Sequence, residues 1–342
     1  MAPVSTRAEL GQAVAVRRWS RPATVTTACA TVAVAVLAAL PYLAGTGVTQ
    51  ALVTLFLLVS MAVLWNLLAG YAGMVSFGQQ AYLGIGAYLV WLVSSKTGLS
   101  PFLAIVAGAA GCAVAGVPIF ALIRRLAGGY FAVATWVVAE CLFLYVTNQL
   151  WLGGGTGVGL QQLSGMAPVL RNAYTYWTAL GLTVVIVAGV YLLVRSRFGL
   201  DSRAVHDDRA AAAAMGVEVP RTRWLAYLIA ATGFGAVGGM LIISTLYIDP
   251  ATVFNVNYSA DMLFMVVIGG LGTMEGPIIG AVIFFAVQEK FAASGVWYLV
   301  AIGAVAIVVV LAAPGGLWGL AARRGWELLP VGYRTRAAEE QP

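Results

Sequence analysis

Ten apolar segments recur along this 342-residue chain, and they constrain its fold more than any other feature. A helix of about 20 apolar residues is long enough to cross a bilayer. The segments lie at about 23–44, 49–70, 74–94, 101–123, 129–149, 175–194, 223–248, 259–271, 275–289 and 295–313. The pattern predicts an all-α fold, a polytopic integral membrane bundle of about eight to ten transmembrane segments. The segments 259–271 and 275–289 are short, so broken or re-entrant helices are predicted there.

The composition indicates that a membrane is the solvent for most of the chain. Charged residues make up 9% of the sequence, whereas a soluble domain has about 25%. The mean hydropathy is +0.91, and no long charged block interrupts the apolar segments. We therefore expect one transmembrane domain over 23–313, preceded by an N-terminal arm over 1–22 and followed by a tail over 314–342.

Arginines gather in four clusters, which predict the topology. The clusters are the N-terminal arm, Arg124–Arg125, the loop 195–223 and the C-terminal tail. Lys and Arg in short loops stay in the cytoplasm, and ten crossings that start there place all four clusters and both termini on that side. The net charge of +6 follows from this arrangement and does not indicate a nucleic-acid partner. The outer loop 150–174 carries a glycine-rich run that is costly in a helix, so it is either a flexible connector or a docking surface.

The stretch Asn66–Tyr88, NLLAGYAGMVSFGQQAYLGIGAY, is unusually polar and glycine-rich for a membrane segment. Polar side chains and helix-weakening glycines are tolerated at membrane depth where they face protein or water. The stretch therefore predicts either a lined pathway or a tight helix interface, with packing favoured at Gly84 and Gly86. The candidate path or gate residues in it are Asn66, Gly73, Ser76, Gly78 and Gln79.

Two further places hold polar residues within apolar segments. Glu140 lies deep in the segment 129–149, where an ionisable residue usually faces the bundle interior or a cavity; a structural hydrogen bond is the alternative. The turn GGLGTMEGP separates two short apolar segments, and discontinuous helices often lie at transport sites. It adds four path or gate candidates: Gly269, Gly270, Gly272 and Glu275. For Glu275, ordinary placement at a membrane interface is the alternative.

The loop 195–223 is the one substantial hydrophilic insertion. Its centre, Ser202–Met215, favours a single helix because of its alanine run, with Asp201 as the expected N-cap and Gly216 as the expected stop. A protruding helix with small apolar residues suits docking onto a soluble protein, and a solvated helix at the membrane edge is the alternative. The candidate docking residues are Arg203, Asp207, Asp208, Arg209, Ala211, Met215 and Gly216.

No motif for catalysis or metal binding is found in the sequence. The nucleotide-binding pattern G-x-x-x-x-G-K-S/T does not occur, and the single histidine, His206, cannot form a histidine cluster. The cysteines Cys29, Cys112 and Cys141 each lie in an apolar segment, and we expect them to be small buried hydrophobic residues.

Three segments in order resemble the permease subunits of branched-chain amino acid ABC transporters, the LivM-type family. They are the stretch 66–88, YFAVATWVVAECLFLYVTNQLWLGGGTGVG at 130–159 and MVVIGGLGTMEGPIIGA at 265–281. The resemblance implies that Arg203–Gly216 is a coupling helix that docks on a cytoplasmic ATPase. This sequence departs from the family pattern because alanines replace several acidic residues of the coupling segment.

The resemblance also implies the partners and the location. A second related permease, two ATP-binding subunits that hold ATP and Mg, and an extracytoplasmic substrate-binding protein would complete an importer surrounded by membrane lipid. The chain itself is expected to be non-catalytic, to bind no cofactor, and to lie in a bacterial inner (plasma) membrane.

The implied substrate is a branched-chain amino acid or a related small metabolite. Urea, amides and aromatic acids are alternatives within the same wider family. Outside the family, an ion-gradient-driven secondary transporter and a membrane scaffold without a path are the alternatives.

Overall fold

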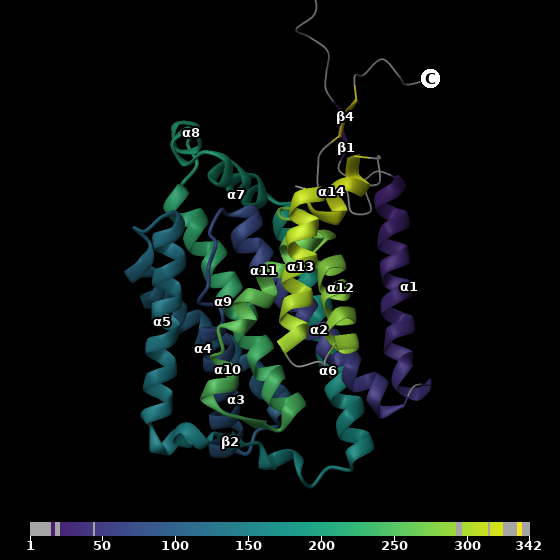
Figure 1. Ribbon diagram of the computed structural model, residues 1–342, viewed down its shortest axis with the longest axis vertical. Coiled ribbons are helices and arrows are strands. Elements are labelled where there is room, and N and C mark those ends of the chain that lie inside the picture. The colour runs from purple at the N-terminus through teal and green to yellow at the C-terminus, as the bar shows by residue number, and fades with distance from the viewer. Residues whose placement is uncertain are drawn as a thin grey trace, which may run out of the picture.

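The computed structural model describes residues 15–17, 21–43, 45–291, 296–313, 315–323 and 334–336. Its long helices are α1 (Arg21–Leu43), α2 (Thr46–Asn66), α3 (Gln80–Thr97), α4 (Pro101–Ile123), α5 (Gly128–Asn148), α6 (Pro168–Val194), α9 (Val219–Thr245), α11 (Asn257–Gly269), α12 (Gly276–Phe291) and α13 (Val296–Ala312). Each coincides largely with one predicted apolar segment, so the helical membrane bundle is confirmed (Figure 1). Within the described residues, six stretches are long and apolar enough to span a membrane: Thr46–Tyr71, Pro101–Ile123, Gly128–Asn148, Pro168–Val194, Val219–Thr245 and Pro250–Gly269.

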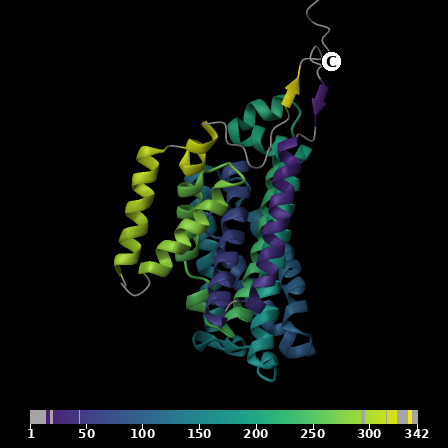
Figure 2. The same cartoon turned by 90° about the vertical axis from the view of Figure 1, so that its right-hand side faces the viewer.

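Two helices, α2 and α9, form the centre of the bundle. α9 packs along α3 and α4, while α2 packs against α6 and α12. The most apolar part of α2 with its extension is 78% buried and that of α9 is 72% buried, compared with 22% for α5. A helix that is apolar all round suits a position surrounded by other helices. α5 is therefore an edge helix, and α13 lies outermost on the side of α12 (Figure 2).

Glycines allow the central helices to approach one another closely. A Cβ atom at Gly86 of α3 would overlap the backbone of Gly235 in α9, and one at Gly84 would overlap the ring of Phe254. Small residues at helix interfaces permit this kind of backbone contact in membranes. The prediction of tight packing at Gly84 and Gly86 is therefore confirmed.

Arginine-bearing segments lie together at one end of the bundle, which we call the arginine end. The short helices α7 (Arg197–Asp207), α8 (Arg209–Ala214) and α14 (Gly316–Arg323) lie there, as does the pairing of β1 (Ala15–Arg17) with β4 (Arg334–Arg336) (Figure 1). The Arg223 guanidinium donates a hydrogen bond to the carbonyl of Arg124 (3.1 Å), which joins the start of α9 to the end of α4. Most of the predicted arm and tail lies outside the described residues.

The predicted helix over 74–94 begins later than expected. α2 continues into a π-helical turn at Leu67–Tyr71, residues 72–79 form no regular helix, and α3 begins only at Gln80. Gly73 has a φ of +62°, a conformation that glycine adopts at little cost. The indole of Trp65 donates to the carbonyl of Ser76 (2.9 Å), which holds the irregular segment against α2. Non-helical backbone at membrane depth is tolerated here because protein surrounds it.

The outer loop is shorter than predicted and contains short structural elements. It contains the 3₁₀ turns Leu150–Leu152, Gly154–Thr156 and Gln161–Leu163, and α6 begins at Pro168 rather than near residue 175. Strand β2 (Val158–Gly159) pairs with β3 (Tyr247–Ile248), and Tyr247 donates a hydrogen bond to the carbonyl of Thr156. These contacts tie the loop to the end of α9, and its role as a connector or as a docking surface stays a prediction. We call this opposite end of the bundle the β2 end; the short helix α10 (Pro250–Val253) follows β3 there.

The cysteines do not share one environment. Cys112 in α4 is buried and donates to the carbonyl of Tyr82 (3.4 Å), as expected for a small core residue. Cys141 is exposed, so its predicted burial is wrong, because α5 is an edge helix with one uncovered face. The side chain of Cys29 lies outside the described residues.

Candidate functional site

Asn66 joins the end of α2 to the turn between α11 and α12. Its side-chain Nδ2 donates to the carbonyl of Thr273 (2.7 Å), and its Oδ1 accepts from the backbone N–H of Gly272 (2.9 Å). A Cβ atom at Gly70 would overlap the backbone of Gly272, so the two segments touch. The polar stretch and the glycine turn, 206 residues apart, therefore form one unit, which we call the Asn66 clamp.

The turn between α11 and α12 is compact because glycines occupy its strained positions. Gly270 and Gly272 have φ values of +133° and +74°. The hydroxyl of Thr273 donates to the carbonyl of Gly270 (2.8 Å) and accepts from the N–H of Gly276 (3.1 Å). A Cβ atom at Gly269 would overlap the carbonyl of Gly276, which requires a residue without a side chain there.

Glu275 is buried rather than exposed at an interface. Its residue surface is 8% exposed, and it lies close enough to Tyr71 to act on it electrostatically. Burial within the bundle does not set the depth of Glu275 in the membrane, so interfacial placement stays the alternative to a path role. The sequence missed Tyr71 because an aromatic residue in an apolar segment carries no functional signal by itself.

The irregular segment after the π-helical turn packs against α5. The Ser76 hydroxyl accepts from the Gln79 amide (2.8 Å) and from the N–H of Gly78 (3.3 Å). The N–H of Phe77 donates to the hydroxyl of Thr135 in α5 (3.1 Å), and Gly78 lies against the Thr135 backbone. The Gln79 Oε1 is buried and has no hydrogen-bond partner among the described residues.

The coupling segment lies directly against the end of the π-helical turn. The guanidinium of Arg203 in α7 stacks over the ring of Tyr71, 5.2 Å from its centroid. A Cβ atom at Gly73 would lie 3.2 Å from both the Cα and the Nδ1 of His206. Arg203, predicted as a docking residue, is thus partly turned toward the membrane domain. The sequence had no signal for these contacts, since they join residues that are far apart in the chain.

The predicted single helix over 202–215 is two helices. Asp208 adopts an extended conformation (φ −153°, ψ 115°), which ends α7 and starts α8. Its carboxylate accepts hydrogen bonds from the N–H groups of Ala210 (2.7 Å) and Ala211 (3.1 Å), so Asp208 is an N-cap. Asp201 lies inside α7, so its predicted capping role is wrong. Gly216 follows α8 with a φ of +88° and ends the helix as predicted.

One face of α8 offers small apolar residues to its surroundings. Ala212 is buried and anchors the helix, whereas Ala211 and Gly216 are exposed, and Met215 is 72% exposed. The carboxylate-bearing Asp207 and Asp208 are exposed beside this face, and Arg209 is half-buried. We call this exposed face, with its acidic edge, the α8 surface.

Glu140 lies near the middle of α5, about 18 Å along the helix from Gly128 at 1.5 Å per residue. It is exposed, and no hydrogen bond or ion pair joins it to the described part of the chain. The neighbouring Val133, Val137 and Leu144 on the same helix are also exposed. The structure does not bring Glu140 to the Asn66 clamp, and the alternative of an internal hydrogen bond finds no support among the described residues.

Residues 47–311 match the family model described as the branched-chain amino acid transport system permease component. The match covers nearly all of α2 to α13, including the Asn66 clamp and the α7–α8 segment, but not α1. The chain belongs to this permease family. As a member of the family it is a multi-pass membrane protein and a transport component.

Individual relatives of this permease show the same likeness at low identity. The chain is 25% identical to the high-affinity branched-chain amino acid transport permease LivM of Salmonella typhimurium over 74% of its length, and it spans 65% of that relative. It is 24% identical to LivM of Escherichia coli over 84% of its length and spans 73% of that protein. The autoinducer 2 import permease LsrC of Klebsiella pneumoniae is 31% identical over 41% of each chain. No solved structure matches the chain.

Proposed function

We propose that this permease is a membrane subunit of an ATP-driven importer, in which α8 docks on a cytoplasmic ATPase. One observation carries the proposal: an unbroken series of contacts leads from the α8 surface into the membrane domain. α8 is joined to α7, α7 contacts Tyr71 and Gly73, and Asn66 binds the turn between α11 and α12.

These contacts suggest how ATP hydrolysis in a partner reaches the path. A displacement of α7 acts on the end of the π-helical turn because Arg203 stacks on Tyr71, and on the residues after it because His206 lies against Gly73. The Asn66 clamp passes the displacement to the start of α12, because its two hydrogen bonds hold the turn. Packed elements with two discrete arrangements transmit such shifts between distant sites.

Family membership supports the rest of the proposed importer. A second related permease would complete the path along α5, where Glu140 is exposed in mid-helix, and two ATP-binding subunits would meet the α8 surfaces. An extracytoplasmic binding protein would dock at the β2 end, where Leu150 and Trp151 are exposed. In this arrangement the arginine end and both termini lie in the cytoplasm, and the membrane is a bacterial inner membrane.

Branched-chain amino acids are the proposed substrates, because the relatives named LivM match most of this chain. Urea, amides and aromatic acids are the second candidates. Import of the autoinducer 2 class has weaker support because LsrC matches 41% of the chain. Uptake of labelled leucine, measured with the cognate binding protein, distinguishes these candidates. An unlabelled compound of each class lowers leucine uptake only if the same importer transports it.

The docking proposal is tested by replacing each of two exposed alanines at the arginine end with arginine and comparing the two variants. Ala211→Arg introduces a long charged side chain on the α8 surface, whereas the control Ala127→Arg adds one on the exposed connection between α4 and α5. We expect Ala211→Arg to weaken ATPase co-purification by about tenfold or more, which corresponds to ~1.4 kcal/mol, and to abolish uptake. The control is expected to retain both.

Two results would contradict this proposal. Normal ATPase binding by Ala211→Arg would remove α8 as the docking element. Uptake that persists without any ATPase and stops when a proton or sodium gradient is collapsed would instead support a secondary transporter.

A further inference from the structure

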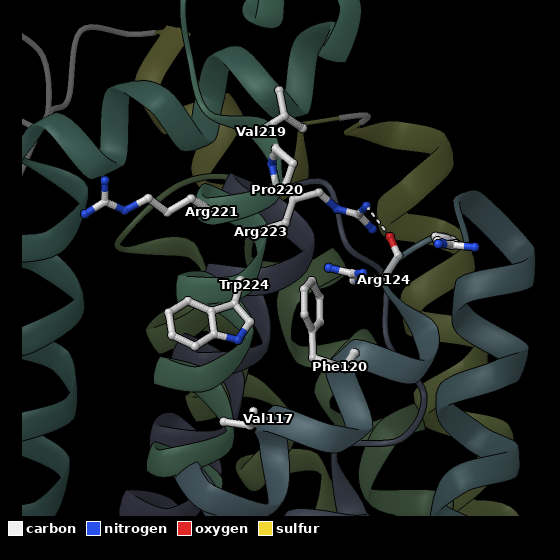
Figure 3. A pocket seen from close by; sticks show the side chains of 10 residues that line it. Val117, Phe120, Arg124, Val219, Pro220, Arg221, Arg223 and Trp224 are labelled. Carbon is white, nitrogen blue, oxygen red and sulfur yellow. Dashed lines mark hydrogen bonds between the residues drawn. The ribbon is translucent and has the colours of Figure 1, made fainter.

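A cavity of about 570 Å³ lies at the arginine end, between the end of α4 and the start of α9 (Figure 3). We propose that this cavity is a binding site for an anionic phospholipid, with the lipid phosphate among its arginines and an acyl chain along α4. The inference does not depend on the transported substrate or on the ATPase. It goes beyond general contact with membrane lipid because it assigns one lipid class to one place.

Four arginines give the rim of the cavity its charge. Arg124 and Arg125 come from the end of α4, and Arg221 and Arg223 come from the first turn of α9. Arg124, Arg125 and Arg221 are exposed, so their guanidinium groups are accessible. Among the described residues, the carboxylate paired with this rim is Glu218, 3.5 Å from Arg221, and both side chains are 70% exposed. Such a surface pair is weak, so it leaves the rim strongly positive.

Arg223 organises the rim from within. It is 7% exposed, and its two terminal nitrogens donate to the carbonyls of Arg124 (3.1 Å) and Leu126 (3.3 Å). These bonds fix the backbone after α4, from which Arg124 and Arg125 project. The Nε of Arg223 is buried without a hydrogen-bond partner among the described residues. Arg223 therefore acts by holding the exposed arginines in place rather than by contacting the ligand through its Nε.

The floor of the cavity is apolar, unlike its rim. Val117 and Phe120 of α4 and Trp224 of α9 line it (Figure 3). Trp224 is 38% exposed near the end of its helix, a position that tryptophan favours at the boundary between head groups and acyl chains. A ligand that fills this space therefore needs a negative head and an apolar body, which a free phosphate ion lacks.

The floor continues into an exposed apolar stripe on α4. The stripe consists of Leu103, Val106, Ala110, Val114, Val117 and Ala121, and all six are exposed. They recur every three or four residues, so they occupy one face of the helix. In a membrane, an exposed apolar helix face contacts acyl chains. The cavity thus lies where a lipid-facing surface meets a cluster of arginines, and basic pockets of this kind between transmembrane helices bind anionic head groups.

The experiment uses the complex purified in detergent, with phosphatidylglycerol and phosphatidylcholine of equal chain length as probes. Native mass spectrometry and quenching of tryptophan by brominated chains report binding. We expect phosphatidylglycerol to bind about tenfold or more tightly than phosphatidylcholine, and the double variant Arg124→Gln, Arg125→Gln to lose this preference, because charge-assisted hydrogen bonds are removed. Arg125→Lys, which keeps the charge, is expected to retain most of it.

The matched control is Arg197→Gln, an exposed arginine of the same end that does not line the cavity. It should bind phosphatidylglycerol as the unchanged protein does. Trp224→Phe should remove part of the quenching while leaving the mass-spectrometric binding in place, which locates the lipid independently of the arginines.

Three outcomes would overturn the proposal. The first is equal binding of phosphatidylglycerol by the double variant and the unchanged protein. The second is displacement of the lipid by inorganic phosphate at equal concentration, which would indicate a free anion as the ligand. The third is cross-linking of a cysteine introduced at Val117 to another protein subunit in the membrane-embedded complex, which would show that protein covers the floor.

Discussion

The segment 66–79 and Glu140 of α5 were both predicted to belong to a path or gate, yet their environments differ. The amide of Asn66 is 1% exposed and makes two hydrogen bonds to the turn between α11 and α12. Glu140 is exposed in mid-helix and makes no hydrogen bond within the described part of the chain. Polar groups inside apolar segments therefore fall into two kinds in this permease.

The difference teaches how to interpret a polar residue at membrane depth. Such a residue needs a partner because lipid supplies none. Asn66 finds its partners within the chain, so it is a joint between two helices. Glu140 finds none among the described residues, so it requires water or another subunit, as the wall of a path would provide. The comparison predicts that removing polar groups paired within the chain mainly alters stability and that removing groups without such a partner mainly alters transport.

The largest expected effect is at the Asn66 clamp. Asn66→Leu leaves the N–H of Gly272 and the carbonyl of Thr273 unpaired, and about 1–3 kcal/mol for each group gives a loss of ~2–6 kcal/mol in the free energy of unfolding. Denaturant unfolding in detergent measures it. The control Asn148→Leu removes a side chain that binds only its own helix and should change stability by less than ~0.5 kcal/mol. Equal effects of both substitutions would show that the clamp is not a special joint.

Alanine substitutions at two glycines, Gly78 and Gly181, give the next largest effect and should change the free energy of unfolding in opposite directions. A methyl group at Gly78 would overlap the Thr135 backbone, so Gly78→Ala is expected to cost about 1–3 kcal/mol. Gly181 in α6 has open space around its Cβ position, so Gly181→Ala should stabilise the helix by up to ~1 kcal/mol. Thermal unfolding midpoints report both changes. A stable Gly78→Ala variant would mean that the segment 72–79 is loosely packed.

Substitution of Glu140 is expected to alter transport and leave stability nearly unchanged. Glu140→Gln should lower uptake by roughly tenfold, ~1.4 kcal/mol, while the free energy of unfolding changes by less than ~0.5 kcal/mol because the side chain is exposed. Cys141→Ser, at the exposed neighbouring position, should leave both quantities unchanged. Normal uptake by Glu140→Gln in an intact complex would remove α5 from the path.

Substitution of Gln79 has the smallest expected effect, and it tests whether this residue belongs to the path or only to the packing of the bundle. It is buried, its amide donates to Ser76, and its Oε1 is unpaired among the described residues. Gln79→Ala should cost about 1 kcal/mol of stability for the lost hydrogen bond and reduce uptake with complex assembly unchanged. A stability loss with uptake intact would place Gln79 with Asn66 as a structural residue and remove it from the path.

The sequence predicted the helices well and the contacts between them poorly. Ten apolar segments marked the helices because apolar length and glycine or proline boundaries are local properties. The late start of α3 at Gln80 was missed, since residues 72–79 are apolar enough for a helix but are held otherwise by Trp65 and Thr135. The N-cap is Asp208 rather than the predicted Asp201. Several residues in that loop are able to cap a helix, and the sequence does not show that α7 packs on Tyr71, the contact seen together with a helix start at Asp208.

By itself, the sequence determined that this protein is a helical membrane bundle whose described arginine clusters lie at one end. Hydropathy and charge placement fix those features segment by segment, without reference to distant residues. Only the tertiary structure decided which polar residues are satisfied inside the chain and which face outward. The partners of Asn66 lie more than 200 residues away, and Glu140 is exposed only because α5 lies at the edge of the bundle. Whether a polar group has a hydrogen-bond partner depends on which residues lie next to it in space, and helix packing determines those residues.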